Sequence, residues 1–207
     1  MRSLRIRNLD VAAAFIALLP HVGSAQELSP ACTDHKPNAI LVDGYVNHPV
    51  QLTIEQLAGL GDQKAMEIHF VDRLGNTQTH TERGPLLWTV INEAAGGIHT
   101  PPPALEQYQG PNPWITLYVV LVATNGYQSL VSEAEIDPGY GNQPVVLSVE
   151  EDGKPMADAP YSNTNKAPAQ LVVPGDYKGG RYANRICRIV VLNGAVGPDL
   201  NPPKRVF

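Results

Sequence analysis

The sequence predicts a single α+β domain built on antiparallel and mixed β-sheet with short helices. Strand-like and helix-like segments follow one another in mixed order instead of alternating as βαβ units, which indicates this fold class. Two turn dipeptides, Asn125-Gly126 and Asp152-Gly153, separate apolar runs and so predict hairpins. No repeat or linker divides the chain, and residues 26–207 suit one domain with its own core.

Residues 1–25 have the composition of a secretory signal peptide. Three arginines precede the short apolar run "VAAAFIALLP", and the small residues of "HVGSA" favour cleavage after Ala25. The alternative, a membrane anchor, is disfavoured because this run is shorter than the about 20 residues that span a bilayer. We therefore expect an N-terminal arm at 26–38, the domain at 39–194, a C-terminal tail at 195–207 and a periplasmic or secreted location.

The charge of the chain argues against two classes of partner. The formal net charge is −5, and removal of the arginine-bearing signal peptide makes the remainder more acidic. An acidic, aromatic-poor chain is a poor match for nucleic acid or for anionic lipid surfaces. No later segment is long and apolar enough to predict a membrane span.

The N-terminal half of the domain predicts a strand, a short helix and a hairpin. The strand is "AILVDGYV" (39–46), and the helix follows in "LTIEQLAGL", where Thr53 and Gln56 have the spacing of a capping box. Residues 65–72 then alternate, with Met66, Ile68 and Phe70 on the expected core face. The turn "RLGN" predicts that this strand pairs with the threonine-rich strand 77–82.

A second helix is expected in "GPLLWTVINEAAGG". Pro85 suits the first turn of a helix, and Gly96 or Gly97 suits its end. The long connection 98–113 follows, and then "WITLYVVLVATNGYQSLVS" predicts a buried strand, a turn and a return strand. Ser132 and Glu135 repeat the capping-box spacing over a one-turn helix. The remaining strands are expected in "PVVLSVEEDGKPM", "QLVVP" and "ICRIVVLN", which makes roughly eight strands and three short helices.

Cys32 and Cys187 are the only two cysteines. An even number in an oxidising compartment permits a disulfide, which would tie the N-terminal arm to the last strand. The alternative is two unpaired cysteines, with Cys187 buried as a small apolar residue. The sequence leaves both readings open.

The segment "PGDYKGGRYANR" (174–185) gathers positive charge beside glycine in an acidic chain. Lys178, Arg181 and Arg185 lie within eight positions, around Gly179 and Gly180. Glycine lets backbone amides approach an anion closely, and flanking cations complete a phosphate-sized site. The alternative is a glycine-rich loop with solvated charges.

Five motifs, in order, resemble the oxidoreductase molybdopterin-binding domain family, which has the sulfite oxidase fold. The motifs fall within four stretches of the chain, "AILVDGYVNHPVQLTIEQLAGL", "THTERGPLLWTVINEAAGG", "LVATNGYQSLVSEAEIDPGYGNQPVVLSVEEDGKPM" and "AQLVVPGDYKGGRYANRICRIVV". Together they span about residues 39 to 192. The resemblance implies that a Pro-Gly-rich loop with basic residues meets the phosphate of the cofactor. Lys178, Gly179, Gly180, Arg181 and Arg185 are then the expected contacts to molybdopterin or a related phosphorylated pterin.

The chain departs from this family at the residue that binds the metal. Catalytic members hold molybdenum through a cysteine that follows the strand corresponding to 65–72, where this chain reads "VDRLGN". Without that thiolate, a soft ligand for molybdenum is missing, and bound molybdenum is not expected.

Three functions follow from the sequence. The first is an exported, non-catalytic binding protein that holds an anionic ligand, or a partner subunit of a redox protein in the periplasm. The second is an oxidoreductase that uses molybdopterin without a cysteine ligand, and the third is an empty domain that acts through its surface.

A metal site made by histidines is the last candidate in the sequence. His69 and His80 would face each other if strands 65–72 and 77–82 pair through the "RLGN" turn. No third cysteine or carboxylate stands at a convincing spacing. We therefore expect both histidines to be polar residues on the face of the sheet.

Overall fold

The computed structural model describes residue 32 and residues 39–98, 113–156 and 169–194. The expected signal peptide, most of the expected arm and the expected C-terminal tail lie outside these residues. Within the described part of the chain, no helix is long and apolar enough to cross a bilayer.

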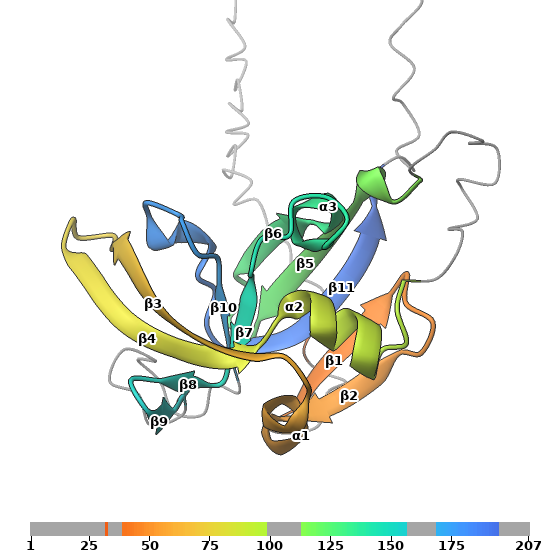
Figure 1. Ribbon diagram of the computed structural model, residues 1–207, viewed down its shortest axis with the longest axis horizontal. Helices are drawn as coiled ribbons and strands as arrows, with labels where there is room; N and C mark the ends of the chain where they lie inside the picture. Colours follow the sequence, from red (N-terminus) through yellow and green to blue (C-terminus); the bar gives the residue numbers. More distant parts are fainter. Residues whose placement is uncertain (1–31, 33–38, 99–112, 157–168, 195–207) are drawn as a thin grey trace, which may run out of the picture.

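A five-stranded mixed sheet forms one layer of the domain, with the strand order β2-β1-β11-β5-β6 (Figure 1). Strands β1 and β11 are parallel, and all other neighbours in this sheet are antiparallel. The Asn125-Gly126 turn joins β5 to β6, as predicted, with Gly126 at a φ of 81°. The five strands are β1 (Ala39–Gly44), β2 (Val50–Thr53), β5 (Leu117–Ala123), β6 (Gln128–Ser132) and β11 (Ile186–Asn193).

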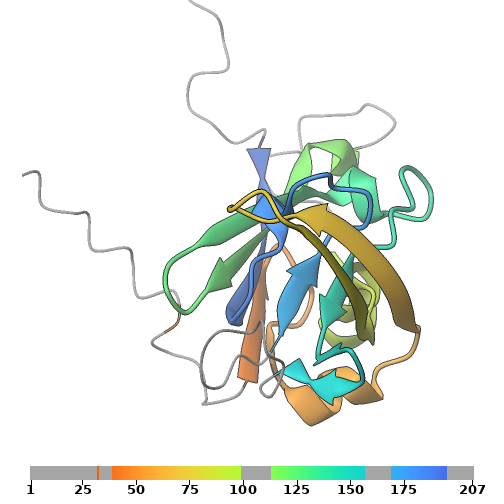
Figure 2. The same ribbon diagram turned by 90° about the vertical axis from the view of Figure 1, so that its left-hand side faces the viewer.

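Two antiparallel sheets stand beside this layer. The long hairpin β3–β4 extends into a four-stranded sheet of order β3-β4-β8-β9, and β10 pairs with β7 (Figures 1 and 2). Backbone pairing between Leu86 and Val146 connects the end of the hairpin to β7. These strands are β3 (Gln63–Val71), β4 (Thr77–Pro85), β7 (Val146–Ser148), β8 (Glu150–Glu151), β9 (Lys154–Pro155) and β10 (Gln170–Val172).

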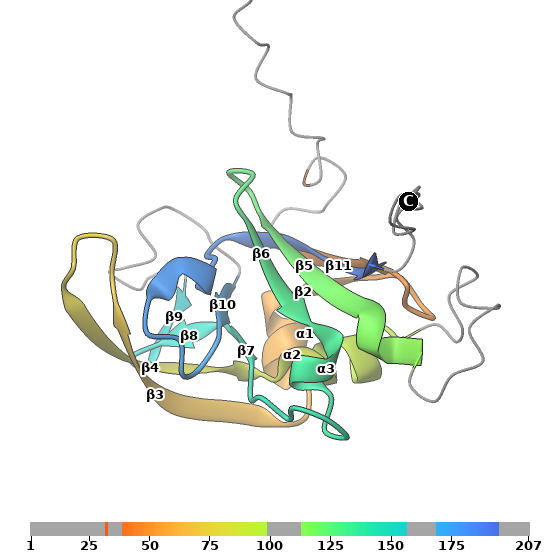
Figure 3. The ribbon, with the colours of Figure 1, turned by 90° about the horizontal axis from the view of Figure 1, so that it is seen from above.

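Helices α1, α2 and α3 lie on one face of the five-stranded sheet (Figure 3). The capping box predicted for the first helix is present, because Thr53 N donates to Gln56 Oε1 at 2.9 Å and Gln56 N donates to Thr53 Oγ1 at 3.3 Å. The helical segments are α1 (Ile54–Gly59), α2 (Leu87–Thr89), the π-helix η1 (Val90–Ala94), the 3₁₀ helix η3 (Pro113–Thr116), α3 (Glu133–Ile136) and the 3₁₀ helix η5 (Gly179–Arg181).

The prediction that Pro85 opens a helix is wrong, because Pro85 is the last residue of β4. The backbone at Gly84 packs directly on β7, so that a Cβ there would lie 2.1 Å from the carbonyl oxygen of Leu147. The chain stays extended until Leu86 and turns into α2 only after this contact. The predicted glycine stop is confirmed, since Gly97 N donates to the carbonyl of Ile91 at 3.0 Å across the end of the helix.

The core lies between the five-stranded sheet and the helices. Its largest fully buried side chains include Ile40, Leu57, Leu87, Leu121 and Ile189. A smaller cluster under the β3–β4 hairpin contains Ile68, Val146 and Val172, packed against Met66, Phe70 and Tyr182. The predicted core face of the 65–72 strand is therefore confirmed.

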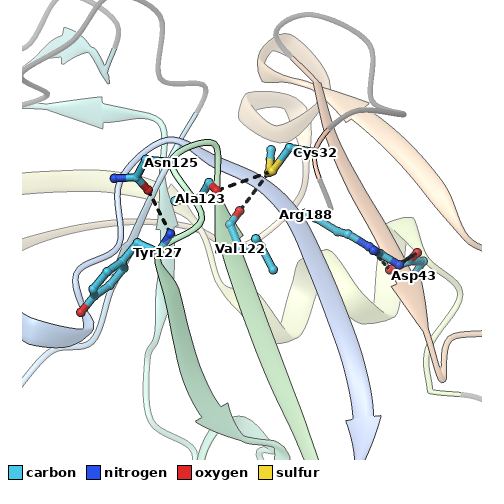
Figure 4. Close-up of a disulfide and its surroundings, with 8 residues drawn as sticks. Cys32, Asp43, Val122, Ala123, Asn125, Tyr127 and Arg188 are labelled. Carbon is cyan, nitrogen blue, oxygen red and sulfur yellow. Dashed lines mark hydrogen bonds and ion pairs between the residues drawn. A yellow bond between two sulfur atoms is a disulfide. The ribbon is translucent and has the colours of Figure 1, made fainter. Parts of the chain in front are cut away.

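Cys32 and Cys187 are joined by a disulfide in the structure, and their Cα atoms are 5.7 Å apart. Cys187 is fully buried on β11, and its sulfur lies 3.2 Å from the carbonyl oxygen of Val122 on β5 (Figure 4). The bridge ties Cys32 to β11, the central strand of the mixed sheet.

Candidate functional site

The principal cleft of the described residues lies between the β3–β4 turn and the segment 177–180. Val71 N donates to the carbonyl of Tyr177 at 2.9 Å, and Val71 pairs in parallel with Lys178. These contacts bring the glycine-rich loop alongside the end of β3, as the views in Figures 1 and 3 show. Gly179 is required here, because a Cβ would lie 2.6 Å from the ring of Phe70.

The cleft has a volume of about 460 Å³ and an aromatic floor. Phe70 forms one wall, and Tyr127 from the β5–β6 hairpin reaches across to donate its hydroxyl to the carbonyl of Gly180. Clefts of this volume with an apolar and aromatic lining are typical of small-molecule sites. The lining residues are Phe70, Val71, Asp72, Arg73, Tyr127, Lys178, Gly179 and Gly180.

The charges at this cleft favour an anion. Lys178 and Arg73 are both exposed at its mouth, and within the described residues neither forms an ion pair. Asp72 also lines the cleft, but its carboxylate is directed into the β3–β4 turn, where it accepts from the backbone amide of Asn76 at 2.9 Å. That hydrogen bond lowers the pKa of Asp72 and keeps the group charged. The cleft is therefore lined by two cations, Lys178 and Arg73, and by one carboxylate, Asp72, that is already hydrogen-bonded within its own turn.

Arg181 stabilises the loop and does not line the cleft. Its guanidinium binds Asp176 through two hydrogen bonds of 2.6 and 2.8 Å, and its third nitrogen donates to Glu135 on α3 at 3.1 Å. These hydrogen bonds, chiefly the one to Asp176, raise the pKa of Arg181 further, so that it stays charged. The same contact explains why the predicted capping box at Ser132 is absent, since the carboxylate of Glu135 is directed to Arg181.

Arg185 stands apart from the residues that line the cleft. Its backbone has a φ of 59°, and its carbonyl accepts from Thr124 N at 2.9 Å, which places it beside the β5–β6 hairpin. Of the five residues predicted from the loop, the structure brings Lys178, Gly179 and Gly180 to the cleft. Arg73 joins them, and sequence reasoning missed it. A signal was present in the sequence, because Arg73 stands in the turn "VDRLGN", the position to which the resemblance assigns a metal ligand.

A second cavity of about 170 Å³ adjoins the first and shares Phe70, Asp72 and Gly179 with it. The ring of Tyr182 packs edge-on against Phe70, with centroids 4.9 Å apart, and its hydroxyl donates to the carbonyl of Val173 at 2.9 Å. Burial raises the pKa of Tyr182 to about 12. The rest of the wall is polar and is made by Gln78, His80, Glu151, Gln170 and Asn184.

Glu82 lies behind this polar wall and is completely buried. It accepts from Ser148 Oγ at 2.6 Å and from Gln170 Nε2 at 3.4 Å. Burial raises the pKa of Glu82 to about 7, and the neighbouring carboxylates of Glu151 and Asp152 act in the same direction. This buried carboxylate was not predicted from the sequence, because Glu82 stands in a threonine-rich strand between the exposed Thr81 and Arg83.

The predicted pairing of His69 with His80 is wrong. The register of the hairpin places His80 opposite Ile68 and His69 opposite Thr79, so that the two histidines point to opposite faces. His69 is exposed and contacts Thr79 Oγ1 at 3.0 Å and Glu67 at 3.0 Å. His80 is buried on the inner face and meets Asp152 at 3.4 Å.

The side chains of the principal cleft fit a phosphorylated aromatic ligand but not molybdenum held by a thiolate. Both cysteines are in the disulfide, and the turn after β3 presents Asp72 and Arg73. The two cations, the glycine backbone and the aromatic wall provide what an anionic ring system needs.

Comparison with known proteins identifies the fold. No protein-family model matches the sequence, and no curated protein sequence matches it. Among solved structures, the domain is similar to a chain of the sulfane dehydrogenase SoxCD from Paracoccus pantotrophus, with 16% identity and a TM-score of 0.53. The match covers 74% of this chain and 37% of that chain, so this protein corresponds to little more than a third of its neighbour. The predicted fold class, an α+β domain of the sulfite oxidase type, is thereby confirmed.

Proposed function

We propose that the protein is an exported, non-catalytic binding protein of the sulfite oxidase fold that holds a phosphorylated, pterin-like ligand in the cleft between the β3–β4 turn and residues 177–180. The observation that carries this proposal is the pair of cations, Lys178 and Arg73, at the mouth of an aromatic cleft. Arg181 supports the site indirectly, because it fixes the loop that carries Lys178 through Asp176 and Glu135. The periplasm is the proposed location, which agrees with the predicted signal peptide.

The absence of an available thiolate favours binding over catalysis. Cys187 is fully buried and bridged, and the position after β3 carries no sulfur. We propose that the ligand is held without molybdenum, either for storage or for presentation to a redox partner in the same compartment. The second candidate is an oxidoreductase that uses molybdopterin without a cysteine ligand. It is favoured by the shared fold with a protein named as a dehydrogenase.

Thermal unfolding in the presence of phosphate ligands tests the proposal. Inorganic phosphate and neopterin monophosphate should each raise the melting temperature, with the larger effect from the pterin, because a ligand that binds only the folded state stabilises it. At a concentration of 100 times Kd the gain is about 2.7 kcal/mol. The shift should shrink at high salt, where exposed charges are screened.

Charge-removing variants locate the site. Lys178→Gln and Arg73→Gln should each remove most of the ligand-induced shift. Lys154→Gln is the matched control, since Lys154 is an exposed cation on β9 that does not line the cleft. A shift that is equal in all three variants, or no shift at millimolar ligand, would contradict the proposal and favour a domain that acts through its surface.

A further inference from the structure

Three side chains of types that can bind a metal ion lie together at the junction of β4 and the β8–β9 turn. His80 comes from β4, Glu151 from β8 and Asp152 from the turn that follows. Strand pairing of Glu82 with Glu151 holds the two segments together, and the backbone amide of Asp152 donates to the carbonyl of Thr81 at 2.8 Å. Residues about 70 positions apart in the sequence are thus fixed on one rigid frame.

The donor atoms are close enough to share one ion. One imidazole nitrogen and two carboxylate oxygens lie within 4.8 Å of one another. The distance from His80 Nδ1 to Asp152 Oδ2 is 3.4 Å. In a tetrahedral site with metal–ligand bonds of about 2.1 Å, two ligand atoms are about 3.4 Å apart, which matches this distance. The other oxygen of Asp152 accepts from Thr81 N at 2.8 Å, and this bond orients the carboxylate toward the histidine.

The surroundings of the three residues favour a cation. His80 is 5% exposed and Glu151 is 1% exposed, and the fully buried Glu82 stands opposite Glu151 on the paired strand. Among the described residues that line the adjoining cavity of about 170 Å³ there is no lysine or arginine. Lys154 pairs opposite Glu151 on β9, but it is exposed and lies outside this lining. Buried carboxylates that lie close together repel one another, and a bound cation offsets that cost.

We propose that His80, Glu151 and Asp152 bind one divalent metal ion, with zinc as the ion they fit best. One imidazole and two carboxylates are borderline to hard ligands, and Zn²⁺ accepts this set in tetrahedral geometry. Three protein ligands leave a fourth position open. His80 and Glu151 both line the 170 Å³ cavity, from which water or an oxygen of a small ligand would complete the coordination. This site is separate from the two cations of the principal cleft, and it does not depend on the function proposed above.

Metal titration of the mature chain, treated with a chelator and with its disulfide intact, tests the site. Calorimetry with ZnCl₂ at pH 7.5 should show one ion per chain with a Kd of about 1 µM or below. At 100 µM free Zn²⁺ the melting temperature should rise by about 5 °C or more. Mg²⁺ at the same concentration should have little effect, because it prefers oxygen ligands in octahedral geometry.

Variants decide whether these three residues are the ligands. His80→Ala and Asp152→Asn should each weaken zinc binding by about tenfold or more. Asp152 is exposed, so Asp152→Asn remains informative even if His80→Ala destabilises the fold. His69→Ala is the matched control, because His69 also contacts a carboxylate, Glu67, at 3.0 Å but on the outer face. Lys178→Gln should leave zinc binding unchanged. No binding at 100 µM Zn²⁺, or wild-type affinity in both His80→Ala and Asp152→Asn, would overturn the proposal.

Discussion

Replacing Glu133 with glutamine should change how the stability of the protein depends on pH. Glu133 is the first residue of α3 and is 1% exposed, and within the described structure its Oε2 has no hydrogen-bond partner. It faces a cavity of about 130 Å³ that Trp88, Asn92 and Asp137 also line. Burial raises the pKa of Glu133 from 4.5 to about 7, and the neighbouring charge of Asp137 adds to the effect.

The sign and size of the effect follow from this raised pKa. Between pH 4.5 and 7 the folded protein keeps a proton on Glu133 that the unfolded chain releases, so stability falls as the pH rises. The contribution is fully present below pH 4.5 and is lost as the pH passes through 7. From pH 5 to pH 8 the loss amounts to about 2.5 kcal/mol, at about 1.36 kcal/mol for each pKa unit. Glu133→Gln cannot titrate and should not suffer this loss.

Urea unfolding at pH 5, 6, 7 and 8, with EDTA present and the disulfide intact, measures the difference. The free energy of unfolding of Glu133→Gln relative to the wild type should rise by about 2.5 kcal/mol between pH 5 and pH 8. Glu82 titrates in both proteins, so its contribution cancels. Glu93→Gln, a change at an exposed carboxylate of the same region, should keep most of the wild-type dependence. If the difference stays constant within about 0.5 kcal/mol across this range, Glu133 does not carry the proton and the reasoning is wrong.

Three further predictions concern the disulfide, the loop and the chemistry. Cys32→Ser should lower the free energy of unfolding by up to about 5 kcal/mol, because the bridge joins residues 155 positions apart, and two free thiols in denatured, unreduced wild-type protein would contradict it. Arg181→Met should lower the free energy of unfolding in denaturant by roughly 1–2 kcal/mol, because it leaves the carboxylates of Asp176 and Glu135 without their partner. Lys64→Met, which removes an exposed ion pair, should change it by less than about 0.5 kcal/mol. Equal losses in the two variants would refute the role of Arg181. The purified protein should not oxidise sulfite or reduce sulfoxides at enzyme-like rates, because no thiolate is available for molybdenum, and turnover that tracks molybdenum content would show otherwise.

Local chemistry made much of the fold predictable. The capping box at Thr53 and Gln56, the Asn125-Gly126 hairpin and the glycine stop at Gly97 depend on residues a few positions apart, and each is present. The prediction of a helix start at Pro85 was wrong because Gly84 packs on Leu147, a tertiary contact that helix propensity does not take into account.

The candidate site was less predictable, because its geometry depends on register and on long-range pairing. A shift of one residue in the β3–β4 register separates the expected histidine pair and turns His80 inward. The pairing of β4 with β8 then brings Glu151 close to His80, and no spacing in the sequence predicts this contact. Of the three cations expected in the loop, Lys178 lines the cleft, whereas the partners of Arg181 come from both the loop and α3, so that its charge is already neutralised.

Chemical analysis of the protein purified from its native host decides whether the cleft holds a phosphorylated pterin. Native mass spectrometry, pterin fluorescence after oxidation, and phosphorus and molybdenum determination should be carried out on the same sample. We expect a phosphorylated pterin at up to one per chain, without molybdenum, and its loss from the Lys178→Gln variant. Molybdenum in stoichiometric amount with the pterin would contradict the account and favour the oxidoreductase. A preparation that contains neither pterin nor any other phosphorylated ligand would also contradict it and would leave a domain that acts through its surface.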